Sequence, residues 1–135
     1  MLLIGIDYGL RHIGISVGDT VSKSAKPLCG FKYRGEELMS KLQEIIERWQ
    51  PEKVIVGLPL NADGTNQPLT EKVFLFVNAL SSKFGLPVEC VDERWSTVEA
   101  KASLHSVNKT KKVSKSMVDA ESARLILEQW LFENA

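Results

Sequence analysis

The sequence lacks the features that mark membrane, secreted or strongly polyanion-binding proteins. Its 17 basic and 17 acidic residues give no net charge, so any binding to a polyanion depends on local patches. No segment approaches the ~20 apolar residues that cross a membrane, and the apolar run at residues 2–6 is too short for a signal peptide. We therefore expect a cytoplasmic protein without a membrane partner.

Cysteine is also scarce. The two cysteines, Cys29 and Cys90, stand in apolar contexts without metal-ligand spacing, which predicts reduced thiols in a cytosolic core. A chain of 135 residues that is 44% hydrophobic can bury a core without disulfide bonds. We expect one compact domain over residues 1–135.

The hydrophobic periodicity predicts an α/β fold. An apolar run at residues 2–8, an alternating pattern at 13–19 and a β-branched run at 53–58 predict strands, and two more strands are expected at 26–33 and 87–92. Helical stripes and stop signals predict helices that end before Pro51, run from about Pro68 to Gly85, start near residues 96–99, and run from about 117 to 132. Three antiparallel strands followed by parallel βα units imply a mixed five-stranded sheet flanked by helices.

Several acidic residues stand at the carboxyl ends of the predicted parallel strands, where ligands bind in folds of this class. Asp7 ends the first strand, and Asp92 and Glu93 follow the last. The carboxyl ends of parallel strands meet at one rim of a sheet, where ligands bind. Asp119 stands in the predicted first turn of the last helix, in phase with the apolar residues Ala123, Ile126 and Trp130. We expect it to point at the same rim.

Three converging carboxylates predict a metal site. At 4 Å and an effective dielectric constant near 20, each pair would repel by about 4 kcal/mol, and a cation removes that cost. Oxygen ligands favour Mg²⁺ or Mn²⁺, and two such ions can hydrolyse a phosphodiester. We therefore predict that Asp7, Glu93 and Asp119 are the catalytic residues and metal ligands, with Asp92 as the alternative to Glu93.

Each acid also has a simpler interpretation. Asp7 could be a strand-ending turn residue. Asp119 could form a helix capping box with Ser116, and Glu93 could pair with Arg94 or with solvent.

Local basic patches are candidates for phosphate contacts. Arg11 follows the first strand and Arg94 adjoins Glu93. Four lysines precede Asp119, at positions Lys109, Lys111, Lys112 and Lys115. The alternative is a solvated loop. Contacts of this kind predict weak, salt-dependent binding of nucleic acid.

Four segments together resemble the YqgF (RuvX) family, in the family's order and over nearly the whole chain. They are IDYGLRHIGISVGD at residues 6–19, VGLPLNADGT at 56–65, DERWSTVEA at 92–100 and KSMVDA at 115–120.

The resemblance implies an RNase H-like fold related to Holliday-junction resolvases, and a nuclease that matures the 5′ end of pre-16S ribosomal RNA. It carries the family's acidic positions over to Asp7, Glu93 and Asp119. It also carries the family's loop over to residues 57–65, where Asn61 becomes a candidate substrate-binding residue.

The expected activity is therefore phosphodiester hydrolysis on structured RNA, by a monomer or weak homodimer. One alternative is resolution of branched DNA, which needs two active sites and hence a symmetric dimer. Another is a non-catalytic nucleic-acid-binding module for ribosome assembly. A third is a phosphotransferase of the actin/hexokinase type, which needs two lobes where this chain has room for one.

Overall fold

The computed structural model describes residues 1–92 and 114–134 of the chain. Glu93, Arg94, the helix expected from about residue 96, and the lysines at 109, 111 and 112 lie outside the described residues. The strands are β1 (Leu2–Tyr8), β2 (His12–Asp19), β3 (Ser24–Lys32), β4 (Lys53–Leu58) and β5 (Val88–Asp92). The helices are α1 (Glu37–Trp49), α2 (Pro68–Phe84) and α4 (Lys115–Asn134).

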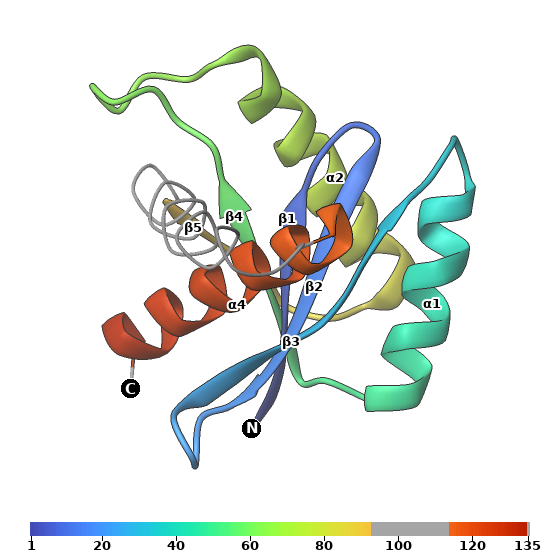
Figure 1. The fold of residues 1–135 in the computed structure, drawn as a ribbon, viewed down its shortest axis with the longest axis vertical. Coiled ribbons are helices and arrows are strands. Elements are labelled where there is room, and N and C mark those ends of the chain that lie inside the picture. Colours follow the sequence, from blue (N-terminus) through green and yellow to red (C-terminus); the bar gives the residue numbers. More distant parts are fainter. Residues whose placement is uncertain (93–113, 135) are drawn as a thin grey trace.

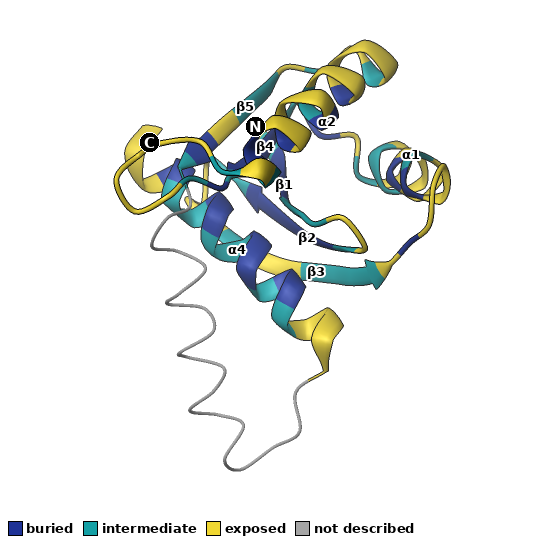
Figure 2. Ribbon diagram, turned by 90° about the horizontal axis from the view of Figure 1, so that it is seen from above, coloured by how far each residue is buried: buried dark blue, intermediate teal, exposed yellow. Residues whose placement is uncertain are grey.

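The strands form one mixed sheet in the order β3-β2-β1-β4-β5. β2 is antiparallel to both β1 and β3, whereas β4 is parallel to both β1 and β5. Helices α1 and α2 cover one face, and α4 crosses the other (Figures 1 and 2). The expected mixed five-stranded sheet, with β1 at its centre, is confirmed.

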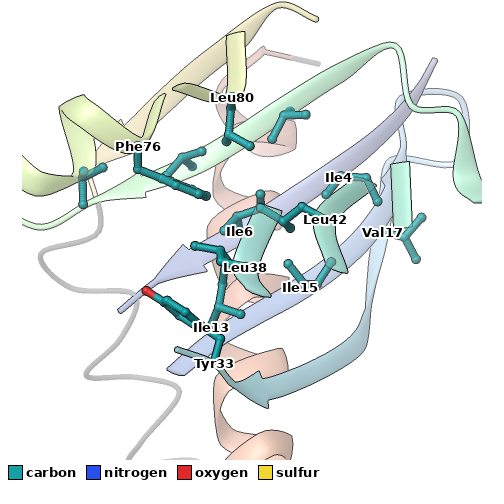
Figure 3. Close-up of a cluster of buried hydrophobic side chains, with 13 residues drawn as sticks. Ile4, Ile6, Ile13, Ile15, Val17, Tyr33, Leu38, Leu42, Phe76 and Leu80 are labelled. Carbon is teal, nitrogen blue, oxygen red and sulfur yellow. The ribbon is translucent and has the colours of Figure 1, made fainter. Parts of the chain in front are cut away.

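The two faces of the sheet are built from different side chains. On the α1/α2 face, β1 and β2 present branched apolar residues such as Ile6 and Ile13, which pack with Leu42 and Phe76 (Figure 3). Side chains alternate between the two faces along a strand, and on the α4 face β2 presents the small residues Gly14, Ser16 and Gly18. A Cβ added to Gly14 would lie 1.9 Å from the carbonyl oxygen of Asp119. The backbone of α4 therefore rests directly on β2.

Several boundaries differ from expectation. β3 begins at Ser24 and α4 at Lys115, both two residues earlier than the patterns predicted. Gly85, at φ 65°, ends α2 as predicted.

The prediction that both thiols lie in the core was wrong for Cys90, which is exposed, while Cys29 is half-buried. Cys90 lies on β5, which is an edge strand of the sheet formed by the described residues. Within the described residues, no helix combines the length and apolar character needed to cross a membrane.

Candidate metal-binding active site

Asp7 lies near the end of the central strand, directly opposite Gly14 of β2. Residues opposite one another in an antiparallel pair project to the same face, with Cα atoms ~5 Å apart. Since Gly14 faces α4, the side chain of Asp7 also belongs to the α4 face. Asp7 is the penultimate residue of β1 (Leu2–Tyr8), as expected for a residue at the carboxyl end of the first strand, and its side chain lies on the α4 face.

Asp119 reaches the same place from the helix. Its carbonyl oxygen lies over Gly14, so its backbone is one strand away from Asp7. The predicted apolar face of the last helix is confirmed, because Ala123, Ile126 and Trp130 are all buried. Close packing is aided by the Ser16 hydroxyl, which donates a hydrogen bond of 2.7 Å to the Ala123 carbonyl oxygen. The structure thus brings two of the three predicted acids together.

The carboxylate of Asp119 is buried, and only one of its two oxygens has a hydrogen-bond partner among the described residues. The residue is 6% exposed. Its Oδ1 accepts a hydrogen bond of 2.6 Å from Lys115 Nζ, while its Oδ2 is buried without a hydrogen-bond partner among the described residues. A buried carboxylate oxygen without a partner is costly. A cation at Oδ2 would remove this cost, so the residue fits the role of a metal ligand.

The capping interpretation of Asp119 is wrong. α4 starts at Lys115, and Ser114 is its N-cap, since the Ser114 Oγ accepts a hydrogen bond of 3.3 Å from the Met117 N–H. Asp119 therefore lies beyond the first turn, where its side chain faces the sheet instead of the orphan amides of the helix end.

The choice between Asp92 and Glu93 can be approached through strand register. Asp92 is paired with Leu58 of β4, and Leu58 packs against the apolar cluster on the α1/α2 face. Residues paired in register share a face, so Asp92 belongs to the face opposite that of Asp7. This register favours Glu93. Because Glu93 lies outside the described residues, its part in the site stays a prediction.

No group of three potential metal ligands among His, Cys, Asp and Glu occurs within residues 1–92 and 114–134. The proposed trio has only two members in that part of the chain, Asp7 and Asp119. The geometric support for a metal site therefore comes from this pair.

The turn that follows Asp7 is held by a buried tyrosine. The Tyr33 hydroxyl donates a hydrogen bond to the Gly9 carbonyl oxygen, and the Tyr33 N–H donates one of 3.0 Å to the Arg11 carbonyl oxygen. Burial raises the pKa of the Tyr33 phenol, which keeps it protonated as a donor. Arg11 is exposed on this turn. The hydrogen bond from Tyr33 fixes the backbone of Arg11, from which the side chain would reach a phosphate if the predicted contact exists.

Asn61 lies in an exposed loop that its own side chain organises. Its Nδ2 donates hydrogen bonds to Thr65 Oγ1 at 3.0 Å and to the Asn66 carbonyl oxygen at 3.2 Å. The predicted turn at Asp63 is present, with Gly64 at φ 90° and the Thr65 N–H donating to Asp63 Oδ1 at 2.9 Å. The loop is thus internally braced. A substrate contact by Asn61 stays a prediction.

The base of this loop is pinned to α2. Thr70 is fully buried, and its hydroxyl donates a hydrogen bond to the Pro59 carbonyl oxygen. The same hydroxyl accepts a hydrogen bond of 3.0 Å from the N–H of Gln67, the N-cap of α2. One side chain therefore fixes both the start of the helix and the entry to the loop.

Sequence reasoning missed the residues that let α4 approach the sheet. Gly14, Ser16 and Gly18 occupy alternate positions of β2, between larger apolar residues. A small residue at every second strand position was the available signal. It marks a face against which a backbone packs closely.

Comparison with known proteins agrees with this geometry. The sequence matches the family described as "RuvX: Holliday junction resolvase" over residues 1–133. The chain belongs to the RuvX family. The resemblance seen in its four sequence segments is confirmed.

Curated relatives of this RuvX chain carry the name "Putative pre-16S rRNA nuclease". The protein from Yersinia enterocolitica is 42% identical over 134 residues, which cover 98% of this chain and 96% of the relative. The one from Sodalis glossinidius is 44% identical over 130 residues, covering 96% and 92%. These names agree with the predicted enzyme class, a hydrolase of phosphodiester bonds.

Solved structures support the fold. Thermus thermophilus RuvC in complex with a Holliday junction substrate aligns with a TM-score of 0.61 and 18% identity, covering 98% of this chain and 94% of that one. The yeast mitochondrial Holliday junction resolvase Ydc2 aligns with a TM-score of 0.55 and 10% identity, covering 96% and 77%. The expected RNase H-like fold of this RuvX chain is thereby confirmed.

Proposed function

We propose that the chain is a metal-dependent endonuclease that hydrolyses phosphodiester bonds in structured RNA and matures the 5′ end of pre-16S rRNA. This proposal rests mainly on the buried Asp119 carboxylate, whose Oδ2 has no hydrogen-bond partner among residues 1–92 and 114–134. This carboxylate belongs to the helix that packs beside the β1 end that bears Asp7. A pure binding module would gain nothing from a buried, only partly compensated carboxylate where phosphates approach.

Asp7, Glu93 and Asp119 would hold Mg²⁺ or Mn²⁺, in a site for two ions. Bound ions of this kind activate water and stabilise the leaving oxygen of a phosphodiester. Asp119 is suited to this role because the packing of α4 on β2 fixes its position before any ion binds.

The substrate would lie along the rim that bears these acids. Arg11, Arg94 and Lys115 would position phosphates, and Asn61 would contact substrate from its braced loop. We propose that residues 1–135 act as one nuclease domain in the cytoplasm, as a monomer or weak homodimer. Branched DNA is the alternative substrate, favoured by the family's description as a Holliday junction resolvase.

The deciding experiment compares two labelled substrates, a precursor rRNA fragment with its 5′ extension and a four-way DNA junction. Wild type is assayed with Mn²⁺ and with chelator, beside Asp7→Asn. The matched control is Asp19→Asn, at the other end of the sheet, where Asp19 pairs with Leu2 and its side chain is 40% exposed. We expect Mn²⁺-dependent RNA cleavage that Asp7→Asn loses and Asp19→Asn keeps.

Other outcomes reassign the function. Undiminished cleavage by Asp7→Asn would remove Asp7 from the site. Cleavage of the junction alone would make branched DNA the substrate. RNA binding without cleavage, in Mn²⁺ and Mg²⁺ alike, would identify a non-catalytic assembly module.

A further inference from the structure

Lys115 and Asp119 form an ion pair along one face of α4. They are four residues apart, a spacing that places side chains on adjacent turns of a helix. Lys115 Nζ lies 2.6 Å from Asp119 Oδ1. The side chains differ sharply in environment, since that of Lys115 is 59% exposed and that of Asp119 only 9%.

This pair compensates part of a buried charge. A carboxylate withdrawn from water is costly unless a cation or hydrogen-bond donors balance it. The Lys115 ammonium balances Oδ1, while Oδ2 has no hydrogen-bond partner in the described part of the chain. Among the described residues, Asp119 therefore has one oxygen paired with an internal cation and one oxygen without a partner.

The two members of the pair differ in their freedom to move. The backbone of Asp119 is locked against Gly14. Lys115 stands on a flexible stem whose charged end can return to water at little cost. A divalent cation at Asp119 would repel the nearby ammonium. Of the two side chains, that of Lys115 is therefore the one that can move away when a metal ion binds.

We propose that Lys115 is the resident counter-ion of Asp119, which the entering metal ion displaces toward the substrate phosphates. The inference rests on the proposed metal site and adds that the metal ion and the Lys115 ammonium compete for the Asp119 carboxylate. Before the metal binds, the ammonium holds the carboxylate in its buried position. After displacement, the same ammonium becomes available to a phosphate oxygen beside the site.

The test measures Mn²⁺ affinity and stability, independently of cleavage. Full-length wild type, Lys115→Met and Lys115→Arg are titrated with Mn²⁺ by calorimetry, and each is melted in chelator and in Mn²⁺. Lys72→Met, which alters an exposed lysine of α2, is the control for loss of one positive charge. Methionine keeps the length and apolar stem of lysine while removing the competing cation.

We expect Lys115→Met to melt below wild type in chelator, because Asp119 loses its counter-ion. We expect it to bind Mn²⁺ about three- to tenfold more tightly, in line with the energy of a partly buried ion pair. Its melting temperature should therefore rise more on Mn²⁺ addition than that of wild type. Lys115→Arg should stay close to wild type, and Lys72→Met should match wild type in both measurements.

Each contrary result has a distinct meaning. Equal Mn²⁺ affinity of Lys115→Met and wild type would overturn the counter-ion proposal and leave the metal site standing. Weaker affinity in Lys115→Met would also overturn it, by showing that Lys115 supports the ion. If neither protein bound Mn²⁺, both this proposal and the proposed metal site would be overturned.

Discussion

Replacing Gly14 by alanine tests the geometry that brings Asp7 and Asp119 together. The added Cβ would lie 1.9 Å from the Asp119 carbonyl oxygen and 2.3 Å from its carbonyl carbon. A real Cβ essentially never comes within 3.0 Å of a heavy atom outside its own residue and its two chain neighbours, so the strand and helix must separate by about 1 Å. Both atoms belong to the backbone, and no side-chain rotation can relieve the contact.

The separation should affect stability and metal binding together. Overpacking of this kind costs about 1–3 kcal/mol, which lowers the melting temperature of a chain this size by roughly 4–11 °C. Moving Asp119 relative to Asp7 should weaken Mn²⁺ binding by about tenfold or more, as loss of ligand positioning does. Thermal unfolding and calorimetric Mn²⁺ titration of Gly14→Ala measure the two effects.

The matched control is Ile13→Val, at the adjacent residue on the opposite face of β2. Ile13 is fully buried, so the variant should lose about 0.5–1.5 kcal/mol and keep wild-type Mn²⁺ affinity. If Gly14→Ala melted and bound Mn²⁺ like wild type, α4 would not rest on β2 as described. The argument that Asp7 and Asp119 are neighbours would then fail.

Two further predictions concern pairs away from the metal ligands. A hydrogen bond from Lys53 lowers the pKa of Glu89 below its ordinary value of 4.5, so this pair stabilises the fold above about pH 4.5 and loses that contribution as the pH falls through the lowered value. Lys53→Met should therefore reduce the stability lost between pH 6 and pH 3 in urea titrations, by less than ~1 kcal/mol because the pair is partly exposed. A steeper acid loss in that variant would contradict the assignment. Thr70→Val removes the hydroxyl bonded to Pro59 and Gln67, which should cost about 1–3 kcal/mol and speed amide exchange in residues 59–67. Thr70→Ser, which keeps the hydroxyl, should exchange slowly, and equal exchange in both variants would refute the role of that hydroxyl.

Much of the fold was predictable because its signals are local. An apolar run marked β1, alternation marked β2, and Gly85 marked the end of α2. Helical phase also correctly placed Asp119 on the buried face of the last helix. The start of that helix was misplaced, because Ser114 and Ser116 are both acceptable caps and only the hydrogen bond to Met117 N–H distinguishes them. The exposure of Cys90 depended on β5 being an edge strand, which no local pattern reveals.

The sequence by itself determined the chemistry available at the site. It placed Asp7 at the end of a strand and Asp119 on the buried face of a helix, and these positions follow from short-range periodicity. Only the tertiary structure decided that the backbone of Asp119 lies over Gly14, the residue paired with Asp7. It also decided that Lys115 occupies one oxygen of Asp119 while the other has no partner among the described residues. The physical reason is that α4 docks through contacts distant in the chain, as in the hydrogen bond that joins Ser16 to Ala123 across 107 residues. Such contacts depend on how closely a whole helix can approach a whole strand, and the glycines of β2 set that distance.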